Sequence, residues 1–213
     1  MKAYPEFAPR LKNQLAATLP GWEAQSLLAP ALRKRVTHIP ENARQSAVLM
    51  LVYQHAGELF IPFMRRAQDG RVHGGQISLP GGKREPGDRD FTHTAVREAH
   101  EEMNIRPNEV DVLGPLSEIY IPPSNFIVYP KVGFAPQRPD FIPNPTEVDE
   151  IIEIPVGELL EDDRVDTFEV DIFGGNKVEA PGFMFLDKYL IWGGTAMIVA
   201  EMVEILKKVK TLS

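Results

Sequence analysis

Apolar residues in the first half of the chain form short runs that are separated by glycine, proline and polar residues. Residues 45–53 are rich in Val and Leu and predict a buried strand, and residues 59–64 predict a second strand. Residues 55–58 between them have a turn sequence, so the two strands are expected to form a β-hairpin. A short strand over residues 76–79 is expected to lead into the turn Pro80-Gly81-Gly82.

The remaining elements mix strands with a few longer helices. Helices are predicted over residues 7–17, 92–103 and 196–208, and a short one over residues 156–161. Further strands are expected over residues 110–120, 126–134, 147–154 and 167–173, the last forming a hairpin with the residues from 177 onward. Strands and helices do not alternate regularly, so the order indicates an α+β sandwich rather than a doubly wound sheet.

Length and composition narrow the class of protein. A chain of 213 residues is expected to form one domain, or one domain with an appendage. Cysteine is absent, which excludes disulfide scaffolds, thiolate zinc sites, iron–sulfur clusters and cysteine nucleophiles. The net charge of −7 argues against a nucleic-acid partner, which requires a basic surface.

The sequence also predicts no association with a membrane. The longest apolar run, residues 47–53, is far shorter than the roughly 20 residues that span a bilayer. The first five residues lack the apolar core of a signal peptide, so a cytoplasmic location is expected.

The predicted helix over residues 92–103 carries the most informative chemistry. Glu98 and Glu102 are separated by four residues and Glu98 and Glu101 by three, so all three carboxylates share one sector of the helix. Like charges at this spacing repel, and they lie near the helix C-terminus, where the helix dipole disfavours anions. The alternatives are a solvated acidic face and a cluster that Mg²⁺ or Mn²⁺ neutralises. The upstream Gly81-Gly82 turn favours the metal site, because bare backbone can approach an ion or a phosphate closely.

The segment resembles the signature box of Nudix hydrolases. The matching residues are Gly82, Asp88, Arg97, Glu98, Glu101, Glu102 and Ile105. There are two departures: Asp88 replaces the loop Glu and stands one residue further from Arg97, and Asn104 replaces the last Gly. Asn104 is a mild change, since Asn is the next best residue for the left-handed conformation that ends a helix.

A narrower resemblance extends over roughly residues 20–205. The segment from His73 to Lys83 is similar to the one that coenzyme A pyrophosphatases of this superfamily carry before the box. Later landmarks are also similar, at residues 120–124, 144–148 and 192–196. The resemblance implies a Nudix-type α/β/α sandwich with a mixed central sheet. It also implies that the Nudix domain covers residues 41–213 and that residues 1–40 form a helical extension packed on this domain.

The implied reaction is hydrolysis of the diphosphate bond of coenzyme A or its derivatives, giving 3′,5′-ADP and 4′-phosphopantetheine. The implied cofactor is Mg²⁺ or Mn²⁺, held by Glu98 and Glu102, with Glu101 as a further ligand or as the group that orients water, and with the Gly81 carbonyl. Glu147 is the candidate general base, with Glu150 or Glu101 as alternatives. Arg97 joins the catalytic set, because it can pair with Asp88 or Glu85 and fix the loop to the helix.

Substrate contacts are expected from residues around the box. The candidates are Arg65, Arg66, His73, Gln76 and Lys83, although each basic residue could instead pair with a nearby acid at the surface. The resemblance implies a small-molecule nucleotide as the substrate and also implies a homodimer. Three other functions stay open. The first is hydrolysis of another diphosphate, such as ADP-ribose, a nucleotide sugar or NADH. The second is a catalytically silent nucleotide sensor, and the third is an acidic docking face for another protein.

Overall fold

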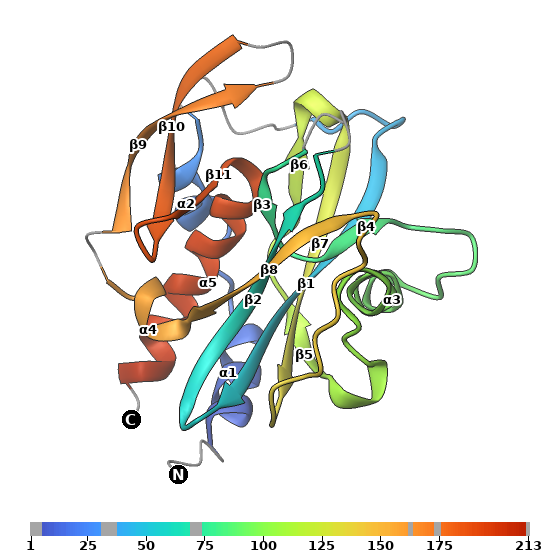
Figure 1. Cartoon of the computed structure of the whole chain (residues 1–213), viewed down its shortest axis with the longest axis vertical. Coiled ribbons are helices and arrows are strands. Elements are labelled where there is room, and N and C mark those ends of the chain that lie inside the picture. Colours follow the sequence, from blue (N-terminus) through green and yellow to red (C-terminus); the bar gives the residue numbers. More distant parts are fainter. Residues whose placement is uncertain (1–5, 31–37, 69–73, 162–163, 173–175, 212–213) are drawn as a thin grey trace.

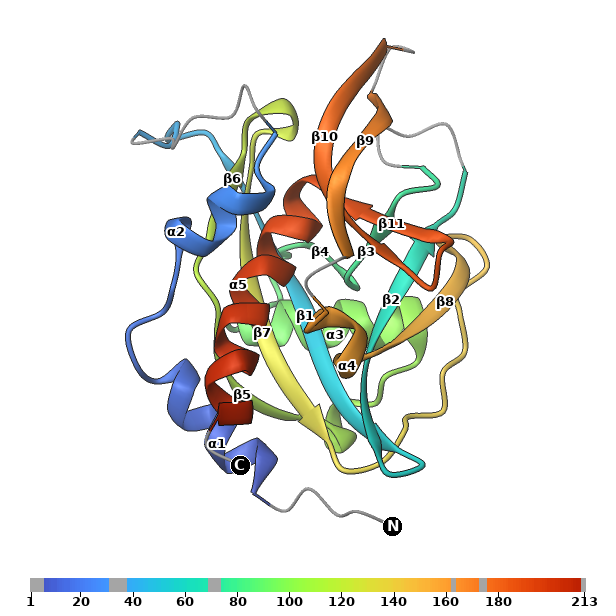
Figure 2. The ribbon, with the colours of Figure 1, turned by 90° about the vertical axis from the view of Figure 1, so that its left-hand side faces the viewer.

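The computed structural model describes residues 6–30, 38–68, 74–161, 164–172 and 176–211. Their centre is a mixed sheet of the strands β1–β8, in which β1 pairs in parallel with β7 and the other pairs are antiparallel. Helix α3 covers one face of this sheet, and α1 and α5 cover the other (Figures 1 and 2). The predicted α+β sandwich with a mixed central sheet is thereby confirmed.

The bounds of the elements agree with most of the predicted ranges. The helices are α1 (Phe7–Leu15), α2 (Trp22–Gln25), α3 (Phe91–Met103), α4 (Val156–Leu159) and α5 (Gly193–Thr211). The strands of the main sheet are β1 (Arg44–His55), β2 (Glu58–Arg66), β3 (Ile77–Ser78), β4 (Gly81–Lys83), β5 (Asp111–Pro115), β6 (Ile119–Ile121), β7 (Phe126–Ala135) and β8 (Val148–Pro155). A separate sheet contains β9 (Val165–Ile172), β10 (Asn176–Phe185) and β11 (Tyr189–Trp192).

Strand β1 lies at the centre of the core, with both faces covered. Leu49 and Leu51 point towards α3, whereas Met50 and Val52 point towards the α1 and α5 side. Because successive side chains of a strand face opposite ways, burial of both sets explains the unbroken apolar run from Ala47 to Tyr53.

The prediction of one strand was wrong. Residues 110–120 do not form a single strand but the two strands β5 and β6, both antiparallel to β7. The chain leaves the ladder between them, where the backbone N–H and hydroxyl of Ser117 donate to the buried Glu201 carboxylate of α5. This tertiary hydrogen bonding takes the segment out of regular pairing.

The N-terminal helices pack on α5 at the face of the sheet opposite α3 (Figure 2). Leu11 and Leu15 of α1 are buried there. Glu201 also accepts hydrogen bonds from the Gly21 amide at 3.1 Å and from the Gln25 side chain at 3.0 Å. No helix in the described part of the chain is long and apolar enough to cross a membrane.

Candidate active site

The Gly81-Gly82 dipeptide brings bare backbone between β1 and α3. Strand β4 pairs with β1 and places Gly81 opposite Val48 and Gly82 opposite Ala47. A Cβ atom on Gly81 would overlap the Ala47 carbonyl oxygen, and one on Gly82 would lie 2.6 Å from the Glu98 carboxylate. Glycine is therefore required at Gly81, whereas at Gly82 a Cβ would have to displace the end of the Glu98 side chain.

Helix α3 is held at both ends by local hydrogen bonds. The Asp90 carboxylate caps its N-terminus and accepts from the His93 amide at 2.8 Å. At the C-terminus, Asn104 adopts the left-handed conformation with φ of 59°, as its place in the sequence predicts. Ala95 and Ala99 are fully buried against the sheet, so the helix packs closely and presents its acids to β4.

Glu102 is the most buried acid of the helix, with 1% of its surface exposed. Its Oε2 accepts a hydrogen bond from the Gly81 amide at 2.7 Å, and the Arg66 guanidinium lies 3.7 Å from its Oε1. Burial raises the pKa of Glu102 to about 8, and the nearby charges of Glu98 and Glu147 act in the same direction. Burial therefore favours the neutral form of Glu102 near pH 7 in the absence of a metal ion.

Glu98, Glu102 and Glu147 form what we call the carboxylate cluster. Burial raises the pKa of Glu98, and Glu147 raises the pKa of both helix acids, so the three groups lie within electrostatic range of one another. Glu101 instead has a half-exposed side chain and pairs with Arg97 at 2.9 Å. Glu98 and Glu102 are thus electrostatically coupled to the predicted general base, and Glu101 also raises the pKa of Glu98.

Arg97 fixes the loop that precedes α3 to the helix. Its guanidinium donates to both Asp88 oxygens at 3.0 Å, and it also reaches Glu98, Glu101 and the Lys83 carbonyl. The predicted pairing of Arg97 with Asp88 is confirmed. These bonds place Arg97 at the edge of the cluster, where it restrains Glu98.

Asp88 is the buried anchor of that loop. Besides Arg97, its carboxylate accepts from the Thr94 hydroxyl and the Glu85 amide and contacts the His93 ring. The hydrogen bonds from Arg97 hold the pKa of Asp88 well below its usual range. With its oxygens engaged in this way, Asp88 acts in loop anchoring. The contribution of His93 and Thr94 was not predicted, although their short spacing from Asp88 in the sequence is compatible with it.

The predicted substrate residues lie on different faces of the sheet. Arg66 faces the carboxylate cluster, whereas Arg65 pairs with Glu150 at 3.2 Å on the opposite face. Lys83 has an exposed side chain, and its backbone contacts Arg97. His73 lies outside the described residues.

Glu150 is held away from the carboxylate cluster. It accepts from the Tyr189 hydroxyl at 2.7 Å as well as from Arg65, and the bond from Tyr189 is the main cause of its lowered pKa. Of the predicted candidates for the general base, Glu147 is the one whose charge raises the pKa of both Glu98 and Glu102.

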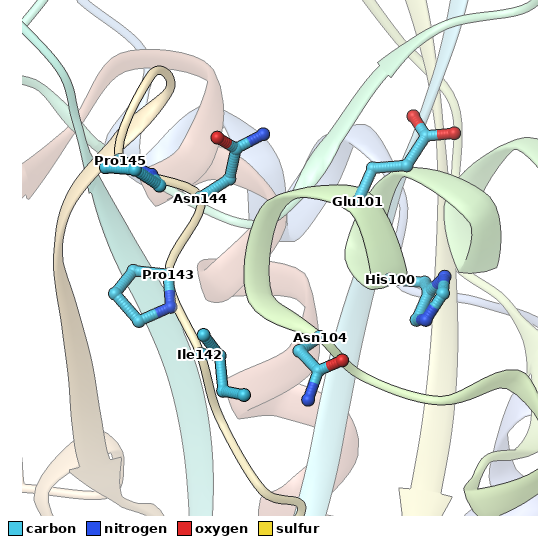
Figure 3. A pocket seen from close by; sticks show the side chains of 7 residues that line it. All are labelled: His100, Glu101, Asn104, Ile142, Pro143, Asn144 and Pro145. Carbon is cyan, nitrogen blue, oxygen red and sulfur yellow. The ribbon is translucent and has the colours of Figure 1, made fainter.

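One hollow lies on the side of the sheet that carries Arg65, and another adjoins the C-terminal end of α3. A cavity of about 500 Å³ lies between the end of β2, β3 and the separate sheet, and its lining includes Arg65, Gln76 and Trp192. A more open hollow of about 390 Å³ lies at the C-terminal end of α3, where Figure 3 shows His100, Glu101 and Asn104 opposite the loop of residues 142–145. The first combines charged, amide and aromatic groups and is suited to a polar organic ligand.

The fold is an α+β sandwich in which the acidic helix α3 packs against the strand β4, which carries Gly81 and Gly82. A NUDIX domain model matches residues 43–171. The chain is 34% identical to the uncharacterized Nudix hydrolase NudL of Pectobacterium atrosepticum over 84% of this chain and 88% of the relative. It is 32% identical to the NudL of Photorhabdus laumondii over 78% of this chain and 87% of the relative.

The chain therefore belongs to the Nudix hydrolase family, as the box residues predicted, and acts on a nucleoside diphosphate derivative. A MutT/nudix family protein from Enterococcus faecalis has a similar fold, with a TM-score of 0.53, 14% identity, and coverage of 99% of this chain and 76% of that structure.

The chemistry of the carboxylate cluster fits the divalent ion that Nudix hydrolases generally use. A buried acid with a raised pKa, two neighbouring acids and the Gly81 backbone supply oxygen ligands, which Mg²⁺ and Mn²⁺ prefer. Among the described residues, no three His, Asp or Glu side chains already have the geometry of a metal site. Arg97 lies 2.9 Å from Oε1 of Glu98, so it would compete with a metal ion for this oxygen.

Substitution of Gly82 tests how closely the backbone must approach Glu98. In Gly82→Ala the new Cβ displaces the Glu98 carboxylate, so we expect kcat/KM to fall by about 100-fold while the melting temperature changes little. Gly87→Ala is the matched control, because a Cβ there meets nothing within 4 Å. Steady-state kinetics and thermal unfolding of both variants check this; equal activity of the two would remove Glu98 from the site.

Proposed function

We propose that the chain hydrolyses the diphosphate bond of coenzyme A or its derivatives in the presence of Mg²⁺ or Mn²⁺. The products would be 3′,5′-ADP and 4′-phosphopantetheine or its acyl form. The observation that carries the choice of substrate is the cavity beside β3, because it is lined by the segment whose sequence resembles coenzyme A pyrophosphatases.

The lining of that cavity suits an uncharged arm that carries amide groups. Gln68 and Gln76 offer amides for hydrogen bonding, and Ile77, Leu190 and Trp192 offer apolar surface. The charged residues of the lining balance in sign, since it includes Arg65, Lys188, Glu169 and Asp171. Pantetheine combines amides with an apolar chain, whereas the sugar end of ADP-ribose does not.

The chain's own residues have distinct parts in the proposed reaction. Glu98, Glu102 and the Gly81 carbonyl would hold the divalent ion, which when bound neutralises the diphosphate and activates the attacking water. Glu147 would receive the proton of that water, since its charge is close enough to raise the pKa of both helix acids. Arg66 supplies positive charge beside the cluster, and Arg97 fixes the loop and Glu98.

A substrate panel with matched metal conditions tests the proposal. We expect kcat/KM for coenzyme A to exceed that for ADP-ribose and NADH by at least about 10-fold, the discrimination typical of a well-fitted apolar group. Mass spectrometry should identify 3′,5′-ADP as the product, and EDTA should abolish turnover until Mg²⁺ or Mn²⁺ is restored. Equal or better turnover of ADP-ribose would show that coenzyme A is not the preferred substrate. Turnover in the presence of EDTA would contradict the metal site.

Other expectations stay predictions. These are the cytoplasmic location, the homodimer, the division of the chain at residue 40 and the further metal ligation by Glu101. Size-exclusion chromatography with light scattering would measure the oligomeric state directly.

A further inference from the structure

The loop that precedes β8 is attached to the C-terminal end of α3. The Asn144 amide donates to the Glu102 carbonyl at 2.9 Å, and the Ile142 amide donates to the Met103 carbonyl at 3.2 Å. Both carbonyls belong to the last turn of the helix, where no intrahelical donor is available. The loop therefore satisfies the end of α3 and is fixed directly behind the buried acid.

Asn144 also forms the turn that leads to Glu147. Its backbone carbonyl accepts from the amides of Glu147 at 3.0 Å and Val148 at 2.8 Å. Its side-chain Oδ1 accepts from the Thr146 amide at 3.1 Å and from the Thr146 hydroxyl at 2.8 Å. This is the turn that Asn stabilises by bonding to the backbone two residues later, and the flanking prolines restrict it further (Figure 3).

The far end of the turn is fixed to the sheet. The Glu147 carbonyl accepts from the Ala67 amide at 2.9 Å, just beyond β2. The backbone of Glu147 is thus held on one side by Asn144 and on the other by β2. The charge of Glu147 acts on Glu98 and Glu102 and raises the pKa of both acids.

We propose that Asn144 is a positioning residue that sets the place of the Glu147 carboxylate relative to Glu102. The inference rests on the proposed function, in which Glu147 receives the proton of the attacking water. One residue joins the two acids: its amide binds the backbone of Glu102, and its carbonyl and side chain shape the turn that carries Glu147.

Kinetics of Asn144 variants with coenzyme A and Mg²⁺ give the first test. Asn144→Ala removes the Oδ1 acceptor, and we expect kcat to fall about 10-fold while KM changes less than about two-fold, because the base is displaced but the cavity is not. Asn144→Asp keeps an acceptor oxygen and is expected to restore most of kcat. Asn104→Gly is the control, since it removes the bond from the Asn104 side chain to the Asp140 carbonyl and keeps the left-handed helix end.

A double-mutant cycle separates positioning from general stability. Glu147→Gln is expected to lower kcat by about 100-fold, and adding Asn144→Ala to it should cost nothing more, because the group that Asn144 positions is already lost. Amide exchange of the metal-free proteins gives a second reading: the Thr146 and Glu147 amides should exchange faster in Asn144→Ala than in Glu147→Gln.

The outcomes distinguish this inference from the proposed function. Costs that add in the double variant, or full activity of Glu147→Gln in an active enzyme, would overturn the positioning role and leave the diphosphatase intact. Failure of the unaltered enzyme to hydrolyse any nucleoside diphosphate derivative would overturn both.

Discussion

Glu102→Gln is expected to lower kcat/KM by about 1,000-fold or more without loss of the folded structure. The variant removes an anionic ligand worth several kcal/mol to a divalent ion, and each 1.4 kcal/mol corresponds to about a tenfold change in rate. The amide oxygen of Gln still accepts from the Gly81 amide, so the contact at 2.7 Å between β4 and α3 can persist. Kinetics at saturating Mn²⁺ would check the loss, with Glu58→Gln at the exposed start of β2 as control.

The same variant has an expected pH signature. Because burial raises the pKa of Glu102 from its ordinary 4.5 to about 8, ionisation of this acid opposes folding. The metal-free protein should therefore lose stability as pH rises from about 4.5 to about 8, and Glu102→Gln should lose less. Thermal unfolding across this range, with and without Mn²⁺, measures the difference. Unchanged turnover of the variant, or equal stabilisation of both proteins by Mn²⁺, would contradict the assignment of Glu102 as a metal ligand.

Glu201→Ala is expected to cause the largest loss of stability, about 4 kcal/mol. The Glu201 carboxylate is fully buried and accepts from Gly21, Gln25 and both donors of Ser117. Each buried donor left without a partner costs about 1–3 kcal/mol. For a chain of this length the melting temperature should fall by about 10 °C.

A neighbouring acid on α5 provides the matched control. Glu204 is one turn further along the helix and pairs with Lys207 at 3.1 Å near the surface. Glu204→Ala should change the free energy of unfolding by no more than about 0.5 kcal/mol, as is usual for exposed pairs. Similar losses in the two variants, measured by urea unfolding, would show that the buried hydrogen bonds of Glu201 contribute little.

The sequence predicted the elements whose signals are local. The apolar run of β1, the turn before β2 and the left-handed Asn104 follow from neighbouring residues, and so does the grouping of Glu98 with Glu102 on one side of α3. The box residues predicted the family because their spacing is specific to it.

The remainder depends on contacts between distant segments. Residues 110–120 contain a strand pattern, but Glu201, more than 80 residues later, draws Ser117 out of the ladder. Helical spacing places Glu101 beside Glu98, yet it cannot show that Arg97 binds Glu101 at the surface. The approach of Glu147 depends on the pairing of β8 with β2, which no local pattern specifies.

The parallel pairing of β1 with β7 sets an order of events during synthesis. Residues 44–53 pair with residues 126–135, so the centre of the sheet cannot close until the second segment has left the ribosome. The hairpin of β1 and β2 can form earlier, but one edge of β1 then remains open and apolar. Closing so long a loop is entropically costly and slows folding. A nascent chain that stops short of residue 135 is therefore expected to expose an unpaired edge of β1.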